Sequence, residues 1–355
     1  MKRPLIALLF LLIATIALPR IFDSEDKNAA GNGPAPVTLS GRTMGTAYHI
    51  SLIPAADTEH GIEEVHKRIE ARLEQINQRM STYIDDSELN QVNNAGADTW
   101  VDVSAETASV IDTALKISTQ TNGAFDITVG NLVNLWGFGP DINLYAVPEE
   151  NRIREALSKS GYQNLKVRLD PPQIQKSIAG LYLDLSGIAK GYGVDQIAEL
   201  LIALGYPNHL VEIGGEIRTG GEKAPGHPWS IGIERPQSKG RSVIRVVHTS
   251  SSTAMATSGD YRNYFEHQGR RYSHTIDPTT GYPITHRLAA VSVLHDSCML
   301  ADAYATAFMV MGPEHAMEFA KQHNLAIYML VKKDRGFVSL SSPEFEKYIS
   351  STQVK

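Results

Sequence analysis

Two polar residues in one predicted helix could bind a metal ion. Asp302 and Thr306 lie four residues apart in the segment 300–311, which is otherwise small and apolar and ends before Gly312. Their oxygens therefore point from the same helix face. A buried carboxylate needs a partner, and oxygen ligands suit Mg²⁺, which also binds substrate phosphates. The alternative is an aspartate near a helix start that is favoured by the helix dipole.

A second pair of charged residues lies in a predicted strand, turn and helix. Apolar residues alternate over 181–185, as in a half-buried strand, and recur every three or four positions over 188–204, as in a helix. Asp184 lies at the strand end, and Lys190 lies in the first helical turn, where free backbone N–H groups favour an anionic ligand. Both side chains could equally serve solubility alone.

Two loop residues suit roles in a small-molecule site. His274 lies near Asp277 in the polar stretch 272–284, and a neutral imidazole near a carboxylate can act as a general base. It could instead only stabilise a turn. Tyr83 lies in the loop 80–89, where its ring could stack on a flat ligand or simply cover the edge of the core.

The composition limits the kinds of partner. A chain of 355 residues can bury a substantial core. Its net charge of -6, without a basic cluster, argues against nucleic acid. The one cysteine, Cys298, excludes a disulfide framework and a thiolate metal site. The chain has neither a Walker loop nor a Gly-x-Gly-x-x-Gly motif after a strand, so the partner is expected to be a small molecule or another protein.

The N-terminus has the layout of a bacterial export signal. Two basic residues precede the apolar run 5–18, which is short for a full membrane span. Ile21 and Phe22 could lengthen it into a tilted anchor. The sequence has no clean cleavage site, so both a cleaved signal and an uncleaved anchor stay open. We expect a signal sequence or membrane anchor over 1–22 and, from the polar composition that follows, a flexible tether over 23–38.

The rest of the chain predicts an α+β fold, with mixed and antiparallel sheets, helices packed on them and one unit over 39–350. The pattern predicts an opening strand at 42–50 and a long amphipathic helix at 62–80. Later strands are expected at 209–213, 229–233, 242–248 and 291–294, with a hairpin over 261–276 and a strand pair over 325–340.

Eight segments, in order, resemble the ApbE family of FAD:protein FMN transferases and together cover about 41–340. The matching segments are 43–46, 80–83 with 87–89, 123–130 with 135–139, 183–191, 213–216, 257–260, 273–278 with 280–283, and 301–306.

The resemblance implies a periplasmic, magnesium-dependent enzyme with an ApbE-like, T-fold-related catalytic unit. Such an enzyme splits the pyrophosphate of FAD, joins FMN through a phosphoester bond to a threonine or serine of a target protein, and releases AMP. The implied targets are flavin subunits of the sodium-translocating NADH:quinone reductase or of Rnf-type complexes. Members are usually lipoproteins. This chain has no lipidation cysteine after its apolar run, so attachment to the inner membrane would depend on that run.

The resemblance also assigns roles to individual residues. The residues implied to line the FAD site are Met44, Tyr83, Ala124, Phe125, Asp126, Asp184, Lys190 and Ile276. Asp302 and Thr306, with a backbone oxygen near Gly187, would hold Mg²⁺ and make Asp302 part of the catalytic apparatus. His274 is the expected base. Two rivals stay open: a magnesium-dependent FAD pyrophosphatase that uses water, and a periplasmic flavin-binding protein without turnover.

Overall fold

The computed structural model describes residues 35–54, 58–140, 146–235, 242–249, 252–260 and 263–349. Pro34–Lys355 forms one compact unit. The predicted signal or anchor, and most of the predicted tether, lie outside the described residues. Among the residues described, no helix combines the length and apolar character needed to span a bilayer.

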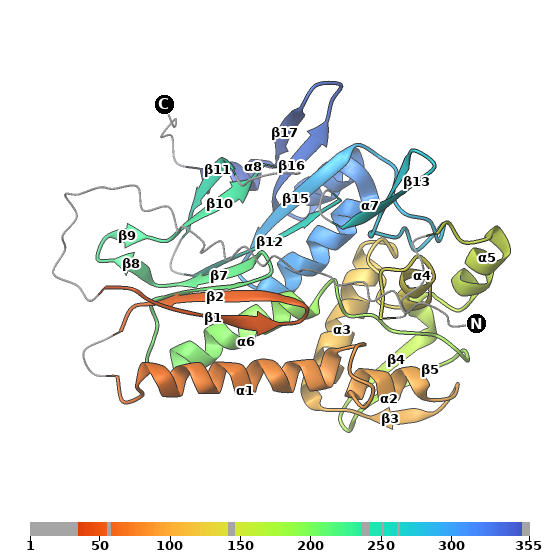
Figure 1. The fold of residues 1–355 in the computed structure, drawn as a ribbon, viewed down its shortest axis with the longest axis horizontal. Coiled ribbons are helices and arrows are strands. Elements are labelled where there is room, and N and C mark those ends of the chain that lie inside the picture. Colours follow the sequence, from red (N-terminus) through yellow and green to blue (C-terminus); the bar gives the residue numbers. More distant parts are fainter. Residues whose placement is uncertain are drawn as a thin grey trace, which may run out of the picture. The chain divides into compact units, whose positions relative to one another are not determined.

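An antiparallel sheet of eight strands is the centre of the fold, in the order β1-β2-β6-β7-β12-β15-β16-β17 (Figure 1). Every neighbouring pair is antiparallel. The strands are β1 Val37–Thr43, β2 Thr46–Leu52, β6 His209–Ile213, β7 Glu216–Gly220, β12 Ser252–Gly259, β15 Leu288–His295, β16 Ala326–Lys332 and β17 Phe337–Ser341.

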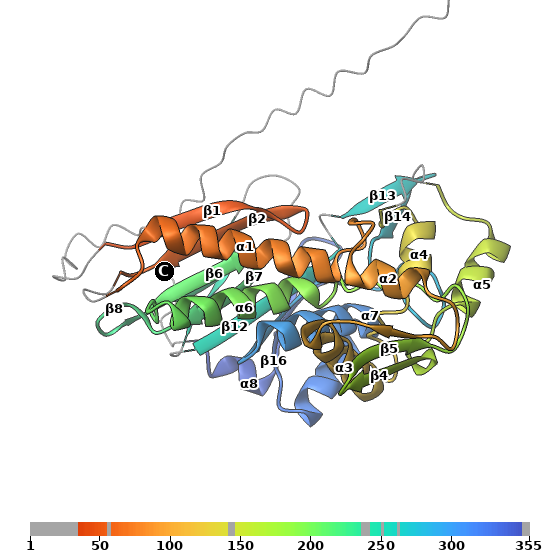
Figure 2. The ribbon, with the colours of Figure 1, turned by 90° about the horizontal axis from the view of Figure 1, so that it is seen from below.

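Three long helices cover one face of this sheet: α1 Ile62–Met80, α6 Ala189–Ala203 and α7 Cys298–Gln322. They lie side by side (Figure 2). The predicted helix at 62–80 is confirmed, and its buried residues recur at helical spacing as the sequence requires. The opposite face is covered by α8 Pro343–Glu346 and by the pair β10 Ser230–Glu234 and β11 Val243–His248.

Smaller elements complete the unit. A three-stranded sheet combines β3 Trp100–Asp102, β5 Pro172–Lys176 and β4 Leu165–Leu169. The remaining helices in the described part of the chain are α2 Glu88–Asn94, α3 Ala105–Gln120, α4 Gly130–Leu135, α5 Glu150–Ser158 and the 3-10 turn Tyr162–Asn164. Two hairpins pair β8 Glu222–Ala224 with β9 His227–Pro228, and β13 Tyr264–His267 with β14 Arg270–Ser273. The α+β prediction is confirmed.

The segment before α6 is extended, but it is not the strand that its alternation predicts. Its only bridge among the described strands joins Tyr182 to Val129. Two backbone hydrogen bonds join the segment to 127–130, from the Asp184 N–H to the Ile127 carbonyl and from the Gly130 N–H to the Tyr182 carbonyl. Side chains supply further bonds: Asn93 Oδ1 accepts from the Leu183 N–H at 2.7 Å, and Lys176 Nζ donates to the Leu181 carbonyl at 3.1 Å. Alternating apolar residues indicate alternating burial, and an extended segment outside a sheet can have the same burial pattern as a strand.

One other predicted boundary is wrong for a local reason. The expected strand at 42–50 is a hairpin, because the chain reverses at Met44 and Gly45, whose φ angles are 48° and 73°. The expected end of a helix before Gly312 is confirmed, because the backbone leaves the helical conformation there and α7 consists of two helical parts. Gly312 has a φ of 77°, and the following Pro313 can occupy the first turn of the second helical part.

Candidate active site

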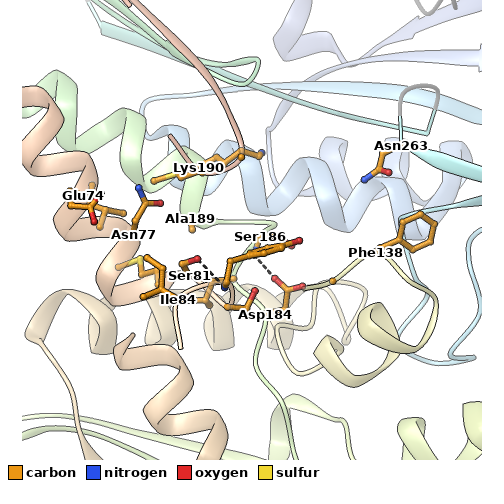
Figure 3. Close-up of a pocket in the computed structure, with 18 residues that line it drawn as sticks. Glu74, Asn77, Ser81, Ile84, Phe138, Asp184, Ser186, Ala189, Lys190 and Asn263 are labelled. Carbon is orange, nitrogen blue, oxygen red and sulfur yellow. Dashed lines mark hydrogen bonds between the residues drawn. The ribbon is translucent and has the colours of Figure 1, made fainter. Parts of the chain in front are cut away.

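A pocket of about 660 Å³ opens where α1, the start of α6 and the β1–β2 turn meet. In Figure 3, Glu74 and Asn77 approach it from α1, while Phe138 and Asn263 lie at the opposite side. Its walls are formed by Met44, Gly45, Glu74, Ile76, Asn77, Met80, Ser81, Thr82, Tyr83, Ile84, Phe138, Gly139, Asp184, Leu185, Ser186, Ala189, Lys190 and Asn263. Four of the predicted FAD-site residues are among them: Met44, Tyr83, Asp184 and Lys190.

Met44 reaches the pocket from the turn between β1 and β2. Asn77 of α1 fixes this turn, since its Nδ2 donates to Thr43 Oγ1 at 3.0 Å. The Met44 side chain packs against α6, where a Cβ built on Gly193 would lie 2.9 Å from its terminal methyl group. The hairpin tip is therefore attached to both helices that wall the pocket.

Tyr83 extends from a braced loop, and 69% of its surface is exposed. Asn90 Nδ2 donates to the carbonyls of Thr82 and Ile84 on either side of it, at 3.0 and 2.9 Å. Partial burial of the hydroxyl and the nearby Asp184 carboxylate raise the pKa of Tyr83. A fixed backbone with an uncovered ring suits stacking on a flat ligand.

Lys190 and Asp184 bring charge to the pocket wall. Asp184 Oδ1 accepts from the Ser186 N–H at 2.8 Å, as the dashed line in Figure 3 shows. Lys190 Nζ lies 2.8 Å from Glu216 Oε1 and 3.7 Å from Asp302 Oδ1. Burial alone lowers the pKa of Lys190, but the two carboxylates outweigh it and the net shift is upward. The ammonium therefore stays charged at the pocket wall, where it can bind an anionic group.

The residues of the predicted metal site lie at the crossing of α7 with the turn before α6. Asp302 is 4% exposed, and its Oδ2 accepts from the Gly191 N–H at 3.0 Å. A Cβ added at Gly187 would lie 3.1 Å from Thr306 Oγ1, so the backbone there closely approaches the hydroxyl. Within the described residues no three His, Cys, Asp or Glu side chains form a metal cluster. Asp302 and Thr306 offer one carboxylate and one hydroxyl, which are oxygen ligands of the kind that Mg²⁺ prefers.

The close crossing of α6 and α7 creates this arrangement. A Cβ added at Gly191 would lie 2.3 Å from the Cys298 carbonyl and 2.8 Å from the Asp302 Cβ. Only glycine allows the first turn of α6 to come this near to α7. The contact places Lys190 beside Asp302.

His274 lies just outside the pocket wall, at the base of the β13–β14 hairpin. Its Nδ1 lies 3.0 Å from the backbone oxygen of Asn263, which does line the pocket, and its ring meets the Phe138 ring edge-on at 6.3 Å. Burial lowers the pKa of His274, and the Lys190 charge lowers it further, against the opposing effects of the Asn263 carbonyl and Asp260. The imidazole is therefore neutral at neutral pH.

The other predicted site residues lie behind the wall. Phe125 is buried, with its ring 3.2 Å from a Cβ built on Gly187, and Ala124 precedes it half-buried. The Asp126 carboxylate accepts from the Thr128 hydroxyl at 2.6 Å and from the Tyr162 N–H at 3.0 Å. Its side chain holds the loop rather than facing the pocket. Ile276 is buried in the cluster of Leu132, Trp136, Ile153 and Phe265.

Sequence reasoning gave no role to several residues that the structure brings to the site. Glu74, Asn77 and Asn263 line the pocket, and the buried Glu216 binds Lys190. The Gly214-Gly215-Glu216 turn was a recognisable signal, because paired glycines mark a sharp reversal that delivers the next side chain. No sequence signal marked Glu74 and Asn77 of α1, because polar residues on a helix surface are usually solvated.

Comparison with known proteins agrees with this geometry. The model of the ApbE family matches residues 44–329. The FAD:protein FMN transferase of Haemophilus influenzae is 43% identical over 316 residues, which cover 88% of this chain and 91% of that protein. The FAD:protein FMN transferase of Escherichia coli K12 is 37% identical over 347 residues, 96% of this chain and 98% of that protein.

Two solved structures share the fold. Flavin transferase ApbE from Vibrio cholerae superposes with a TM-score of 0.82 at 41% identity, covering 88% of this chain and 99% of that one. The apo form of Pseudomonas stutzeri flavinyl transferase ApbE gives a TM-score of 0.82 at 36% identity, covering 90% and 99%. On the match of the family model and the extent of these relatives, the chain belongs to the ApbE family.

Proposed function

We propose that this chain is an FAD:protein FMN transferase that uses Mg²⁺. The observation that carries the proposal is that one pocket has an exposed aromatic ring, a charged lysine beside the buried Asp302 carboxylate, and a neutral histidine at its edge. The function of the curated relatives supports it. A flavin, a pyrophosphate and an attacking hydroxyl need these three features.

The transfer forms one bond and breaks one. The acceptor hydroxyl oxygen bonds to the phosphorus of the FMN half, the P–O bond to AMP breaks, and AMP leaves with the electron pair. His274 receives the hydroxyl proton on Nε2, because the Asn263 carbonyl holds the proton on Nδ1. A positioned base typically contributes about a hundredfold or more.

The transfer also requires that the negative charge of the pyrophosphate be neutralised. Lys190 would bind its oxygens, and Asp302, Thr306 and a backbone oxygen near Gly187 would hold Mg²⁺. When bound, Mg²⁺ would neutralise charge that grows on the leaving oxygen. Tyr83 would stack on a ring of FAD.

The setting of the enzyme is also part of the proposal. The basic and apolar N-terminus supports export to the periplasm and attachment to the inner membrane. Flavin-accepting subunits of membrane redox complexes, of the sodium-translocating NADH:quinone reductase or Rnf type, are the proposed targets. The relatives are FAD:protein FMN transferases, which supports a protein acceptor in general.

The test uses the purified full-length chain with FAD, Mg²⁺ and a candidate flavin subunit bearing an acceptor threonine. A fluorescent protein band after denaturing electrophoresis, with an equal amount of AMP, is expected, and chelation of Mg²⁺ should abolish both. AMP and free FMN without a band, across several acceptors, would instead indicate an FAD pyrophosphatase. Intact FAD throughout would indicate a binding protein.

A further inference from the structure

Glu216 is a buried carboxylate directly behind the proposed phosphate site. It is the first residue of β7, follows the turn at Gly214 and Gly215, and is 3% exposed. Its Oε1 lies 2.8 Å from Lys190 Nζ, and within the described part of the chain its Oε2 has no hydrogen-bond partner. A half-satisfied buried carboxylate is costly, so stability alone does not explain this residue.

The distances around Lys190 define a competition between two carboxylates. The ammonium is within hydrogen-bonding distance of Glu216 at 2.8 Å, whereas Asp302 Oδ1 is 3.7 Å away, which is beyond a hydrogen bond. The other Asp302 oxygen already accepts from the Gly191 N–H. Oδ1 accepts no hydrogen bond within the described residues and is therefore the freer Asp302 oxygen for a metal, as long as Lys190 does not pair with it.

We propose that Glu216 is a positioning residue that holds Lys190 off Asp302 and so keeps the Asp302 carboxylate available to Mg²⁺. The proposal rests on the function proposed above, and it adds a residue to which no role has been given. Without the Glu216 charge, Asp302 would be the nearest carboxylate to the ammonium. Lys190 would then move onto Oδ1, and the metal would have to displace it.

The test measures metal binding without FAD, so it does not depend on turnover. Mn²⁺, a spectroscopic probe for oxygen-ligand sites, is titrated into the full-length protein and followed by electron paramagnetic resonance. Glu216→Gln keeps the size of the side chain and removes its charge. We expect Mn²⁺ to bind about tenfold more weakly, because Lys190 then pairs with Asp302.

A double-mutant cycle separates competition from a general loss of negative charge. Lys190→Met should improve Mn²⁺ affinity far more in the Glu216→Gln protein than in the wild type, because only there does the lysine occupy Asp302. The proposal is wrong if Lys190→Met changes the Mn²⁺ affinity by the same factor in both backgrounds. It is also wrong if Glu216→Gln binds Mn²⁺ as tightly as the wild type. A Glu216→Asp variant, which keeps the charge on a shorter side chain, should fall between wild type and Glu216→Gln.

Glu212→Gln is the matched control. It removes the same charge from the same β6–β7 hairpin, but Glu212 pairs with His49 at 2.7 Å and not with Lys190. Its Mn²⁺ affinity should stay near the wild-type value, and a loss as large as that of Glu216→Gln would contradict specific positioning. The FMN-transfer assay, run separately, tests the proposed function. If the Mn²⁺ double-mutant cycle gives the expected result but no FMN transfer is detected, the proposed function is wrong and the positioning role of Glu216 still holds.

Discussion

At the scale of single residues, the surroundings of His274 suit its proposed role as the base. Its backbone N–H and its Nδ1 both meet the Asn263 carbonyl, at 3.2 and 3.0 Å. A carbonyl only accepts, so the proton lies on Nδ1 and the Nε2 lone pair is free to take a proton. The hairpin therefore sets both the tautomer and the ring direction.

Replacing this base should slow transfer without preventing binding. His274→Asn should lower the rate of FMN transfer about a hundredfold or more and leave the Kd for FAD within about twofold. Single-turnover rates and equilibrium titration measure the two quantities separately. Transfer at the wild-type rate would remove His274 as the base.

The pH profile tests the same residue independently. Since the active form is the neutral imidazole, the rate should fall as pH falls through the pKa of His274. Burial places that pKa below the ordinary histidine value of about 6.5, so kcat/KM should stay flat down to that pH and decline only below it. A decline that begins well above the ordinary value would contradict the assignment, and the acid limb should be absent in His274→Asn.

Tyr83 should contribute through its ring. Tyr83→Ala should weaken FAD binding about tenfold, the upper range for one aromatic contact, whereas Tyr83→Phe should keep nearly all of the affinity. Quenching of flavin fluorescence on titration gives both values. If both variants lose the same amount of FAD affinity, the hydroxyl of Tyr83 and not its ring makes the contact.

At the scale of elements, α7 is held in place by a carboxylate from another helix. Asp195 of α6 accepts from the Cys298 and Met299 N–H groups at 2.9 and 3.0 Å and from the Ser297 hydroxyl at 2.7 Å. Arg218 donates to it at 2.8 Å. These bonds satisfy the free N–H groups at the start of α7 and fix the position of Asp302 one turn further along.

Loss of this anchor should destabilise the unit. Asp195→Ala should lower the free energy of unfolding by about 3 kcal/mol, because it leaves Arg218 and the helix N–H groups without their buried partner. Urea unfolding measures the change. Glu199→Gln is the control: Glu199 lies 3.8 Å from the same arginine and is 57% exposed, so its loss should have little effect.

Element boundaries could be predicted where burial alone decides them. The helix at 62–80 has one apolar face and was predictable to the residue. The segment 181–185 was not, because its hydrogen-bond partners are the backbone of Ile127 and Gly130 and the side chains of Asn93 and Lys176, and most of these lie far away along the chain. The link from Asp195 to α7 spans more than 100 residues and leaves no local pattern.

At the scale of the whole molecule, the pocket is built from segments that meet only in the folded unit. The charged residues of 184–190, the Tyr83 loop and the α7 pair were visible as separate motifs. Their common location followed from the resemblance to a family, not from spacing. Glu216 was visible only as part of a glycine turn, since no sequence pattern shows that its carboxylate would be buried beside Lys190.

Because the pocket joins the β1–β2 hairpin, α1, α6 and the loop before β13, a ligand that fills it should stabilise the entire unit. FAD at about 100 times its Kd should add about 2.7 kcal/mol to the free energy of unfolding, which raises the Tm of a unit of this size by about 5 °C. Calorimetry measures the shift. If Mg²⁺ binds at the proposed site, its chelation should reduce the shift, because Lys190 would then be the proposed group left to oppose the pyrophosphate charge. At the same FAD concentration, Tyr83→Ala should show a smaller shift than the wild type. If FAD raises the Tm of Tyr83→Ala as much as that of the wild type, FAD does not bind against Tyr83, and this pocket is not the flavin site.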